Sequence, residues 1–198
     1  MFPRIMDTSR FFDADSELAV RALDGDREAF GALVEKYQGP IYRFALHFFQ
    51  DPARAEDVAQ DTFLRAYRFL HTYDPSRRFA TWLFTIARNQ CIDRHRDRVR
   101  RDEVDSESVN PLALLAHRPQ EDPLEQLLRQ ENWSRLLGAV RELPEKYKTP
   151  LVLCYLEGMP YQEIADIVGI SLNNVKIRIF RAKKMILKRL GLLNGDEP

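Results

Sequence analysis

The sequence predicts an all-α protein in which two small helical domains are joined by an acidic flexible linker. Apolar residues recur every three or four positions through most of the chain, and no segment shows the alternating pattern of a strand. A segment rich in acidic residues and proline interrupts this period at residues 102–122. The 198 residues, 44% hydrophobic and 30% charged, suffice for two such domains. We therefore expect a flexible tail at 1–14, helical domains at 15–101 and 123–190, and a second tail at 191–198.

Composition argues against a metal site, a cofactor and a membrane span. Cys91 and Cys154 lie far apart and the four histidines are scattered, so no metal-binding spacing is present. We interpret both cysteines as small core residues in a reducing cytoplasm. The N-terminus lacks the apolar stretch of a signal peptide, and no run approaches the roughly 18 apolar residues of a membrane-spanning helix. The 30 basic and 30 acidic residues cancel, so a nucleic-acid-binding surface would require segregated charge.

Two helices should open the first domain. Helical signals begin near Asp15, and Asp26 can cap the second helix by accepting a backbone N–H bond. The pair Gly39-Pro40 would normally interrupt this helix, but the apolar period resumes at Ile41. The second helix is therefore either kinked or restarted at this point.

A third helix should begin at Asp51-Pro52, because Asp is a good cap and Pro suits the first helical position. Four residues share one of its faces: Asp57, Gln60, Asp61 and Leu64. Two carboxylates one turn apart can suggest a metal or an acid–base pair, but no histidine, third carboxylate or phosphate loop accompanies them. We expect no catalytic residue here, and the face is either solvated or a docking surface for another protein.

A turn at residues 73–78 should lead into a long helix over 79–101. The second half of this helix is rich in arginine: Arg88, Arg94, Arg96, Arg98, Arg100 and Arg101. Aromatic rings and an asparagine before a row of arginines suit single-stranded nucleic acid, because bases stack on rings and phosphates meet cations. Alternatively the aromatic residues form the core, an interpretation that we favour for Trp82 but not for Tyr73, which lies in the turn.

The segment after this helix has the composition of a linker. Residues 102–125 contain seven acidic residues and one basic residue, Arg118, and three prolines prevent a continuous helix. The second domain should then begin with an amphipathic helix, and Leu143-Pro144 should start another. The residues expected to face inward from this latter helix are Leu151, Val152, Cys154, Tyr155 and Leu156.

The end of the second domain predicts a helix-turn-helix. Ile164, Ala165 and Val168 give one short helix an apolar face, Gly169 can end it, and Ser171 can cap the next helix. The apolar stripe of that next helix consists of Val175, Ile179, Ala182 and Ile186. Its other face is basic: Lys176, Arg178, Arg181, Lys183, Lys184, Lys188 and Arg189. Such a helix can enter the major groove of DNA, whereas the alternative is an amphipathic helix with a solvated basic face.

Several sequence blocks in this order resemble the extracytoplasmic-function (ECF) class of bacterial sigma factors, in the sigma-70 family. The blocks are DREAFGALVEKYQGPIYRFA, AEDVAQDTFLRAYR, FATWLFTIARNQCIDRHR, LPEKYKTPLVLCYLEGMPYQEIADIVGIS and VKIRIFRAKK. The resemblance implies a factor without catalytic activity that binds core RNA polymerase, directs it to −35 and −10 promoter elements and helps melt the latter. The implied partners are the polymerase clamp and flap, promoter DNA and an anti-sigma factor.

The resemblance also implies roles for particular residues. Asp57, Gln60, Asp61 and Leu64 would dock on the clamp. The residues implied at the −10 element are Tyr73, Arg77, Arg78, Trp82, Arg88, Asn89, Arg94 and Arg96, with Tyr73 and Asn89 at a pocket for a flipped base. Those implied at the −35 element are Ser171, Asn173, Asn174, Lys176, Arg178, Phe180 and Arg181. The acids of 102–107 would mimic RNA in the polymerase channel that nascent RNA later takes.

The recognition segment departs from the common pattern of this class. Relatives often have Gly-Thr before Val175 and a small polar residue after Lys176, whereas this chain has Asn173-Asn174 and Ile177. Because asparagine can read adenine bidentately, the preferred promoter sequence could differ here. Two other classes of function fit less well. An ordinary helix-turn-helix repressor or activator would not need the arginine-rich helix and acidic linker, and a hydrolase using Asp57 and Asp61 lacks metal-ligand spacing.

Overall fold

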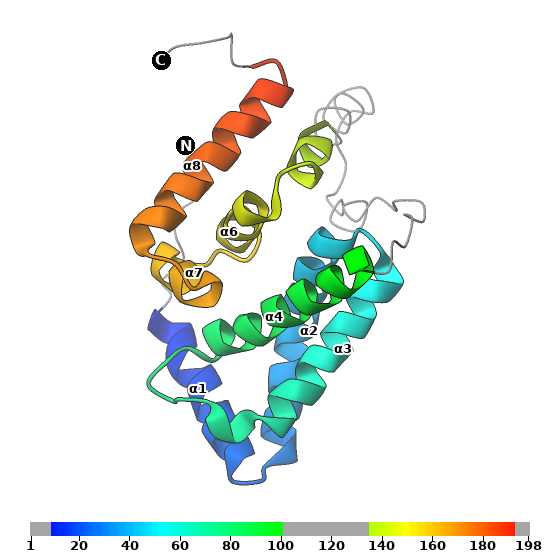
Figure 1. Cartoon of the computed structure of the whole chain (residues 1–198). Helices are drawn as coiled ribbons and strands as arrows, with labels where there is room; N and C mark the ends of the chain where they lie inside the picture. The colour runs from blue at the N-terminus through cyan, green and yellow to red at the C-terminus, as the bar shows by residue number, and fades with distance from the viewer. Residues whose placement is uncertain (1–8, 101–134, 193–198) are drawn as a thin grey trace, which may run out of the picture. The chain divides into compact units, whose positions relative to one another are not determined.

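The computed structural model describes the backbone of residues 9–100 and 135–192, and within these ranges every regular element is a helix. The chain divides into two compact units, Met1–Val109 and Asn110–Pro198 (Figure 1). The predicted all-α fold class is thus confirmed. The predicted linker at 102–122 and the start of the helix expected after it lie outside the described residues, whereas the end of that helix, at residues 135–141, is helical as predicted. No helix in the described part of the chain is long and apolar enough to cross a membrane.

The first unit is built around one long central helix. Its elements are α1 (Ser9–Leu23), α2 (Arg27–Phe49), α3 (Pro52–Arg68), the 3-10 turn η1 (Leu70–Thr72) and α4 (Phe79–Arg100). Helix α2 contacts α1, α3 and α4, so its apolar face forms the centre of the core (Figure 1). Leu33, Ile41, Phe44 and Leu83 are fully buried there, and the rings of Phe44 and Phe84 meet edge to face at 5.6 Å.

The predicted helix caps of this unit are present. The Asp26 carboxylate accepts the backbone N–H groups of Glu28 and Ala29, both at 3.0 Å, and Asp51 caps α3 in the same manner. Helix α2 runs without interruption through Pro40, so the alternative of a restarted helix is wrong. The loss of one backbone hydrogen bond at a proline is outweighed by the apolar face that continues on both sides of it.

Helix α1 begins earlier than the sequence indicated. It starts at Ser9, so residues 9–14 are helical rather than part of a loose tail. The sequence indicates Asp15 as part of a start signal, but its carboxylate accepts hydrogen bonds from the Tyr37 hydroxyl at 2.6 Å and from the Lys36 ammonium at 2.5 Å. Asp15 is only 6% exposed. Its charge is thus compensated by α2, and it has no capping role.

The second unit ends in the predicted helix-turn-helix. Residues 135–141 are helical and are followed by α6 (Glu145–Tyr155), α7 (Tyr161–Val168) and α8 (Leu172–Arg189). Helix α6 packs against α7 and α8, and α7 packs against α8. Gly169 has a φ of 71°, the left-handed conformation that a helix-ending glycine adopts at little cost, and Ser171 caps α8 through the Asn174 N–H.

Two residues expected in this core are not buried. Tyr155 is 52% exposed and Leu156 is 36% exposed, whereas Leu151, Val152 and Leu153 are buried. Tyr155 is the last residue of α6 and Leu156 its C-cap, so neither is covered by a following turn of the helix. The Lys183 ammonium lies 4.8 Å from the centre of the Tyr155 ring instead. Of the two cysteines, Cys91 is fully buried and Cys154 is partly buried.

Candidate nucleic-acid interface

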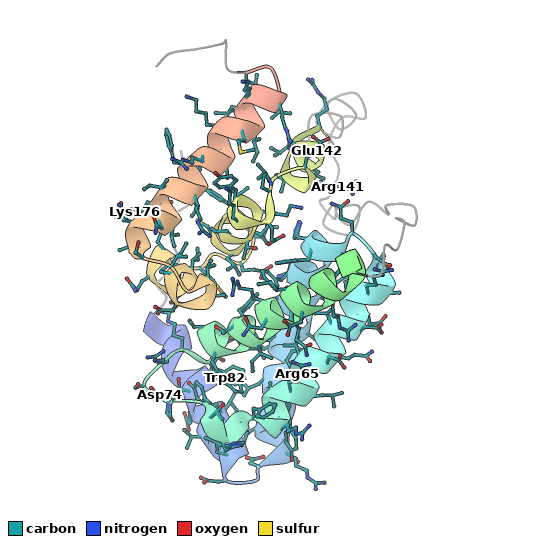
Figure 2. All side chains as sticks on the ribbon, in the orientation of Figure 1. Arg65, Asp74, Trp82, Arg141, Glu142 and Lys176 are labelled. Atoms are coloured by element: carbon teal, nitrogen blue, oxygen red, sulfur yellow. The ribbon has the colours of Figure 1, made fainter. Side chains whose placement is uncertain are left out.

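Helix α8 presents one apolar and one polar face. Val175, Ile179, Ala182 and Ile186 are buried against α6 and α7. Most residues predicted to face DNA are exposed, and Arg178 is partly exposed. The exposed ones are Ser171, Asn173, Asn174, Lys176, Phe180 and Arg181, with Lys176 labelled in Figure 2. Phe180 is 68% exposed, although exposing a large apolar side chain to water costs free energy. The outer face of α8 is therefore accessible to a binding partner.

Not every cation of α8 belongs to this outer surface. The Arg189 guanidinium donates to the backbone carbonyl of Ala139 at 3.2 Å and lies 3.3 Å from the Glu142 carboxylate. It therefore ties the last turn of α8 to the segment before α6, and it should be removed from the basic face that the sequence suggested. Arg181 also has a protein neighbour, because it lies beside the Tyr147 hydroxyl of α6 and lowers the pKa of Tyr147. The sequence could not locate either partner.

The turn before α4 is held by polar contacts of its own. The Asp74 carboxylate accepts the Ser76 N–H at 2.9 Å and the Ser76 hydroxyl at 2.7 Å (Figure 2 shows Asp74). These hydrogen bonds hold the pKa of Asp74 below its usual value. Arg77 and Arg78, both predicted at the −10 element, follow directly, and the Arg77 side chain is 73% exposed. The Asx turn thus leads into the arginine-rich helix with Arg77 exposed and Arg78 only partly exposed.

The expectation for Tyr73 is wrong with respect to its burial. Tyr73 is 4% exposed, and its ring packs against Phe79 and Trp82 with centroid distances of 5.5 and 5.6 Å. Its hydroxyl donates to the Arg77 carbonyl at 2.7 Å and lies 3.1 Å from the Ser16 hydroxyl of α1. Burial raises the pKa of Tyr73, so the hydroxyl stays protonated. Tyr73 supports the turn from within the core in this conformation.

The other predicted −10 residues differ in exposure. Asn89 is exposed, and Trp82, which we interpreted as core, keeps part of its surface accessible. The Arg88 guanidinium lies 3.5 Å from the Asn89 side-chain oxygen, at the limit of a hydrogen bond. The side chain of Arg96 lies outside the described residues. Asn89 and Trp82 are therefore better placed than Tyr73 to meet a base from solution.

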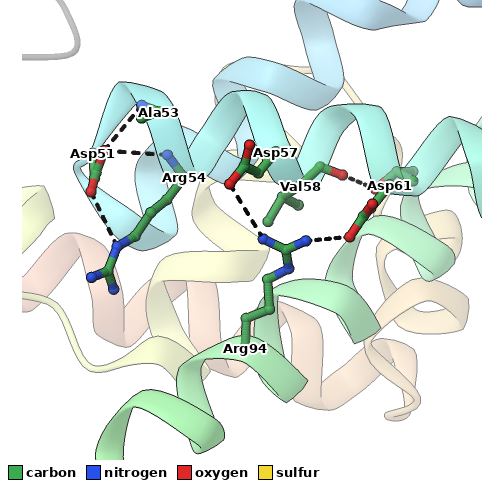
Figure 3. Close-up of polar contacts among 8 residues, drawn as sticks. Asp51, Ala53, Arg54, Asp57, Val58, Asp61 and Arg94 are labelled. Carbon is green, nitrogen blue, oxygen red and sulfur yellow. Dashed lines mark hydrogen bonds and ion pairs between the residues drawn. The ribbon is translucent and has the colours of Figure 1, made fainter. Parts of the chain in front are cut away.

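The acidic face of α3 is not a free surface in the way that the sequence suggested. Gln60 is exposed, and Leu64 is 69% exposed. The two acids, however, share one partner from α4, as Figure 3 shows. Arg94 donates to the Asp61 carboxylate through Nη2, and its Nη1 lies 3.9 Å from Asp57 Oδ2. A residue predicted to bind DNA phosphate thus contacts two residues predicted to bind polymerase.

The same geometry bears on metal chemistry. Among the residues described, no group of three or more histidine, cysteine, aspartate or glutamate side chains could hold a metal ion. The only paired carboxylates that the sequence singled out, Asp57 and Asp61, face a guanidinium instead. The Cys154 thiol, whose pKa is raised by burial, lacks the low pKa of a reactive cysteine.

Comparison with known proteins gives the same division of the chain. Residues 33–101 match the model described as Sigma-70 region 2, and residues 133–186 match that of Sigma-70, region 4. The chain is 34% identical over 182 residues to the RNA polymerase sigma-H factor of Pseudomonas aeruginosa, covering 90% of this chain and 94% of that protein. It is 32% identical over 170 residues to the ECF RNA polymerase sigma factor SigW of Bacillus subtilis, covering 84% and 91%.

A solved structure agrees in fold. The structure of CnrH in complex with the cytosolic domain of CnrY matches with a TM-score of 0.68 and 27% identity, covering 91% of this chain and 99% of that one. The curated relatives are thus matched over nearly their whole length, through both helical units and the helix-turn-helix. The chain belongs to the ECF sigma factors of the sigma-70 family, which are non-catalytic regulators that direct promoter-specific transcription initiation.

Proposed function

We propose that this protein binds core RNA polymerase and directs it to promoters whose −35 element is read by α8. The observation that carries this proposal is the outer face of α8, where polar, basic and aromatic side chains are exposed without a single acidic residue. Phosphates of duplex DNA would meet Lys176 and Arg178. Asn173 and Asn174 stand in the first turn of the helix, where a recognition helix meets base edges.

Two features of α8 bear on promoter preference. An asparagine can accept from and donate to the edge of adenine, so Asn173 or Asn174 favours A·T pairs in the upstream part of the element. Ile177 is 39% exposed where relatives often carry a hydroxyl, and its side chain could contact only an apolar group such as a thymine methyl. We therefore expect a −35 element richer in A·T pairs than that of relatives with Gly-Thr and a small polar residue here.

The first unit would recognise the −10 element as a single strand. The proposed contacts are Arg77 and Arg78 in the turn, Asn89 and the partly exposed Trp82 for bases, and arginines of α4 for phosphates. Tyr73 supports this site from within the core by holding the turn in place. These contacts would help to melt the element, because the protein can bind the unpaired bases only in the open duplex and so stabilises the open form.

The outer face of α3 would dock on the clamp of core polymerase, with a second contact of the factor on the flap. Leu64 supplies an exposed apolar anchor, and Asp57, Gln60 and Asp61 surround it with groups that suit a basic partner. The factor itself would carry out no catalysis and would act in the cytoplasm, where polymerase and promoters are. CnrH is solved with the cytosolic domain of CnrY. Together with the anti-sigma factor that the resemblance to this class implies, this leads us to propose a regulatory partner of the anti-sigma class.

Run-off transcription with core polymerase on a promoter library tests the proposal directly. We expect factor-dependent transcripts from a defined pair of elements, and their sequences would give both preferences at once. A pull-down with core polymerase separates this function from that of an ordinary helix-turn-helix repressor, which would bind duplex DNA without polymerase. Absence of binding to core polymerase would refute the proposal.

A further inference from the structure

Arg94 joins two surfaces that are expected to bind different partners. It projects from α4, the helix of the −10 interface, and reaches Asp57 and Asp61 on α3, the polymerase-docking helix (Figure 3). Both acids lie on the same face because they are four residues apart, one helical turn. A single guanidinium therefore holds two carboxylates that a basic partner would need, and it is itself held by groups that repel phosphate.

The exposure of this cluster indicates that it can open. The side chains of Arg94, Asp57 and Asp61 are 35%, 67% and 43% exposed. Ion pairs with this much water around them change an equilibrium by a factor of roughly 1.5 to 5. The Asp15–Lys36 pair of the same unit differs, because the side chain of Asp15 alone is 8% exposed and is also bound by the Tyr37 hydroxyl. That buried cluster is part of the fold, whereas the Arg94 cluster lies at the surface.

The net charge of the Arg94, Asp57 and Asp61 cluster favours the binding of a further cation. The cluster contains two negative charges and one positive charge, so it keeps one uncompensated carboxylate and attracts a further cation. A basic residue of polymerase that engages Asp57 and Asp61 would reduce their hold on Arg94. A DNA phosphate that engages Arg94 would likewise leave both acids available to polymerase. Each event favours the other, and such coupling is reciprocal by necessity.

We propose that Arg94 exchanges between the Asp57–Asp61 pair and a phosphate of the single-stranded −10 element, and that this exchange couples polymerase docking to DNA binding. The inference rests on the proposed function and adds a regulatory step to it. The free factor keeps Arg94 on its own acids and so binds single strands weakly. Docking on polymerase releases the arginine for DNA.

The test uses the full chain without polymerase and a labelled oligonucleotide of about 20 thymidines, because a phosphate contact does not depend on sequence. Fluorescence anisotropy across a salt series gives the affinity and the salt slope. We expect Asp61→Asn to bind the oligonucleotide 2- to 5-fold more tightly, with a salt slope steeper by about 0.7, the value for one added phosphate contact on a single strand. In the background of Arg94→Gln, the same change should have no effect beyond that of Glu56→Gln.

Glu56→Gln is the matched control, because Glu56 lies on the exposed surface of α3 and no contact with Arg94 is seen. It removes one negative charge and so measures the general electrostatic effect. A gain for Asp61→Asn that is no larger than for Glu56→Gln would overturn the proposal, as would a gain in the Arg94→Gln background that exceeds the effect of Glu56→Gln. Far-UV circular dichroism confirms that each variant is folded.

A separate pull-down with core polymerase distinguishes this inference from the function on which it rests. If the wild-type chain fails to bind polymerase, the proposed function is wrong regardless of the oligonucleotide result. If it binds polymerase while the oligonucleotide cycle shows no coupling, Arg94 only positions the two acids, and the exchange is refuted while the function stands.

Discussion

The Tyr73 hydroxyl offers a way to separate support of the turn from stacking on a base. Tyr73→Phe keeps the buried ring between Phe79 and Trp82 but removes the donor to the Arg77 carbonyl and the contact with Ser16. A net contribution of about 0.5–1.5 kcal/mol is typical of one hydrogen bond. The Arg77 carbonyl lies in an exposed turn and can regain water, so we expect the loss in the free energy of unfolding of the first unit to stay within this range, at about 0.5–1.5 kcal/mol.

The assay can report on this unit alone. Trp82 lies 5.6 Å from Tyr73, and the chain has only one other tryptophan, Trp133. In a Trp133→Phe background, urea unfolding followed by tryptophan fluorescence therefore reports on the surroundings of the turn. For a unit of about 100 residues, 1 kcal/mol also lowers the melting temperature by roughly 4–8 °C.

Function gives the second half of this prediction. If the hydroxyl holds the turn, Tyr73→Phe should weaken open-complex formation together with stability, although a ring able to stack is still present. Tyr67→Phe removes the same atom from a side chain that is 53% exposed, and it should change stability by less than about 0.5 kcal/mol. Wild-type stability in Tyr73→Phe would refute the structural role. If Tyr73→Phe also opens promoters normally, the hydroxyl has no role in function and only the ring can contribute.

Three further predictions concern the caps and α8. Hydrogen bonds from the Ala29 N–H and Arg21 lower the pKa of Asp26, so its contribution to stability is present above the unfolded pKa and is lost as pH falls through the folded pKa. In thermal melts at pH 2–5, Asp26→Asn should therefore lose less stability on acidification than the wild type does. An equal loss in both proteins would contradict this prediction. Gly169→Ala forces a side chain into a φ of 71° and should lower the stability of the second unit by about 1–2 kcal/mol, measured by calorimetry against the helical control Gly138→Ala; equal losses would show that backbone strain is not the cause. Lys176→Ala should weaken binding to duplex −35 DNA and reduce the salt slope by about 0.9 if the contact is a phosphate, whereas an unaltered slope would indicate a base contact or none.

Local signals in the sequence were enough for most of the helices and their ends, but not for the start of α1. Asp26, Asp51 and Ser171 cap helices where they were expected to, because a cap depends on groups two or three residues away. Gly169 ends α7 for the equally local reason that its conformation is left-handed. The start of α1 was missed because Asp15 serves a contact with residues 21 and 22 positions further along the chain.

The functional surfaces were harder to predict, since they depend on which distant residues meet. The buried Tyr73 hydroxyl meets Ser16, which lies 57 residues away, and nothing in the turn itself indicates this contact. The partner of Asp61 is Arg94, 33 residues away on another helix. Sequence reasoning placed these two residues in separate sites, because a periodic pattern assigns residues to faces but not faces to one another. The site assignments themselves stay predictions until tested.

The tie at the end of α8 has a practical meaning for protein engineering. Promoter preference could be transferred between relatives by grafting a recognition helix, but a graft of the whole of α8 would replace Arg189, whose guanidinium holds Ala139 and Glu142. A donor helix without a matching arginine would lose the contacts with Ala139 and Glu142, and the packing of α8 in the second unit would become less stable. A chimera should therefore exchange only the exposed positions between Asn173 and Arg181, retain the buried Val175 and Ile179, and leave the last turn of the recipient in place.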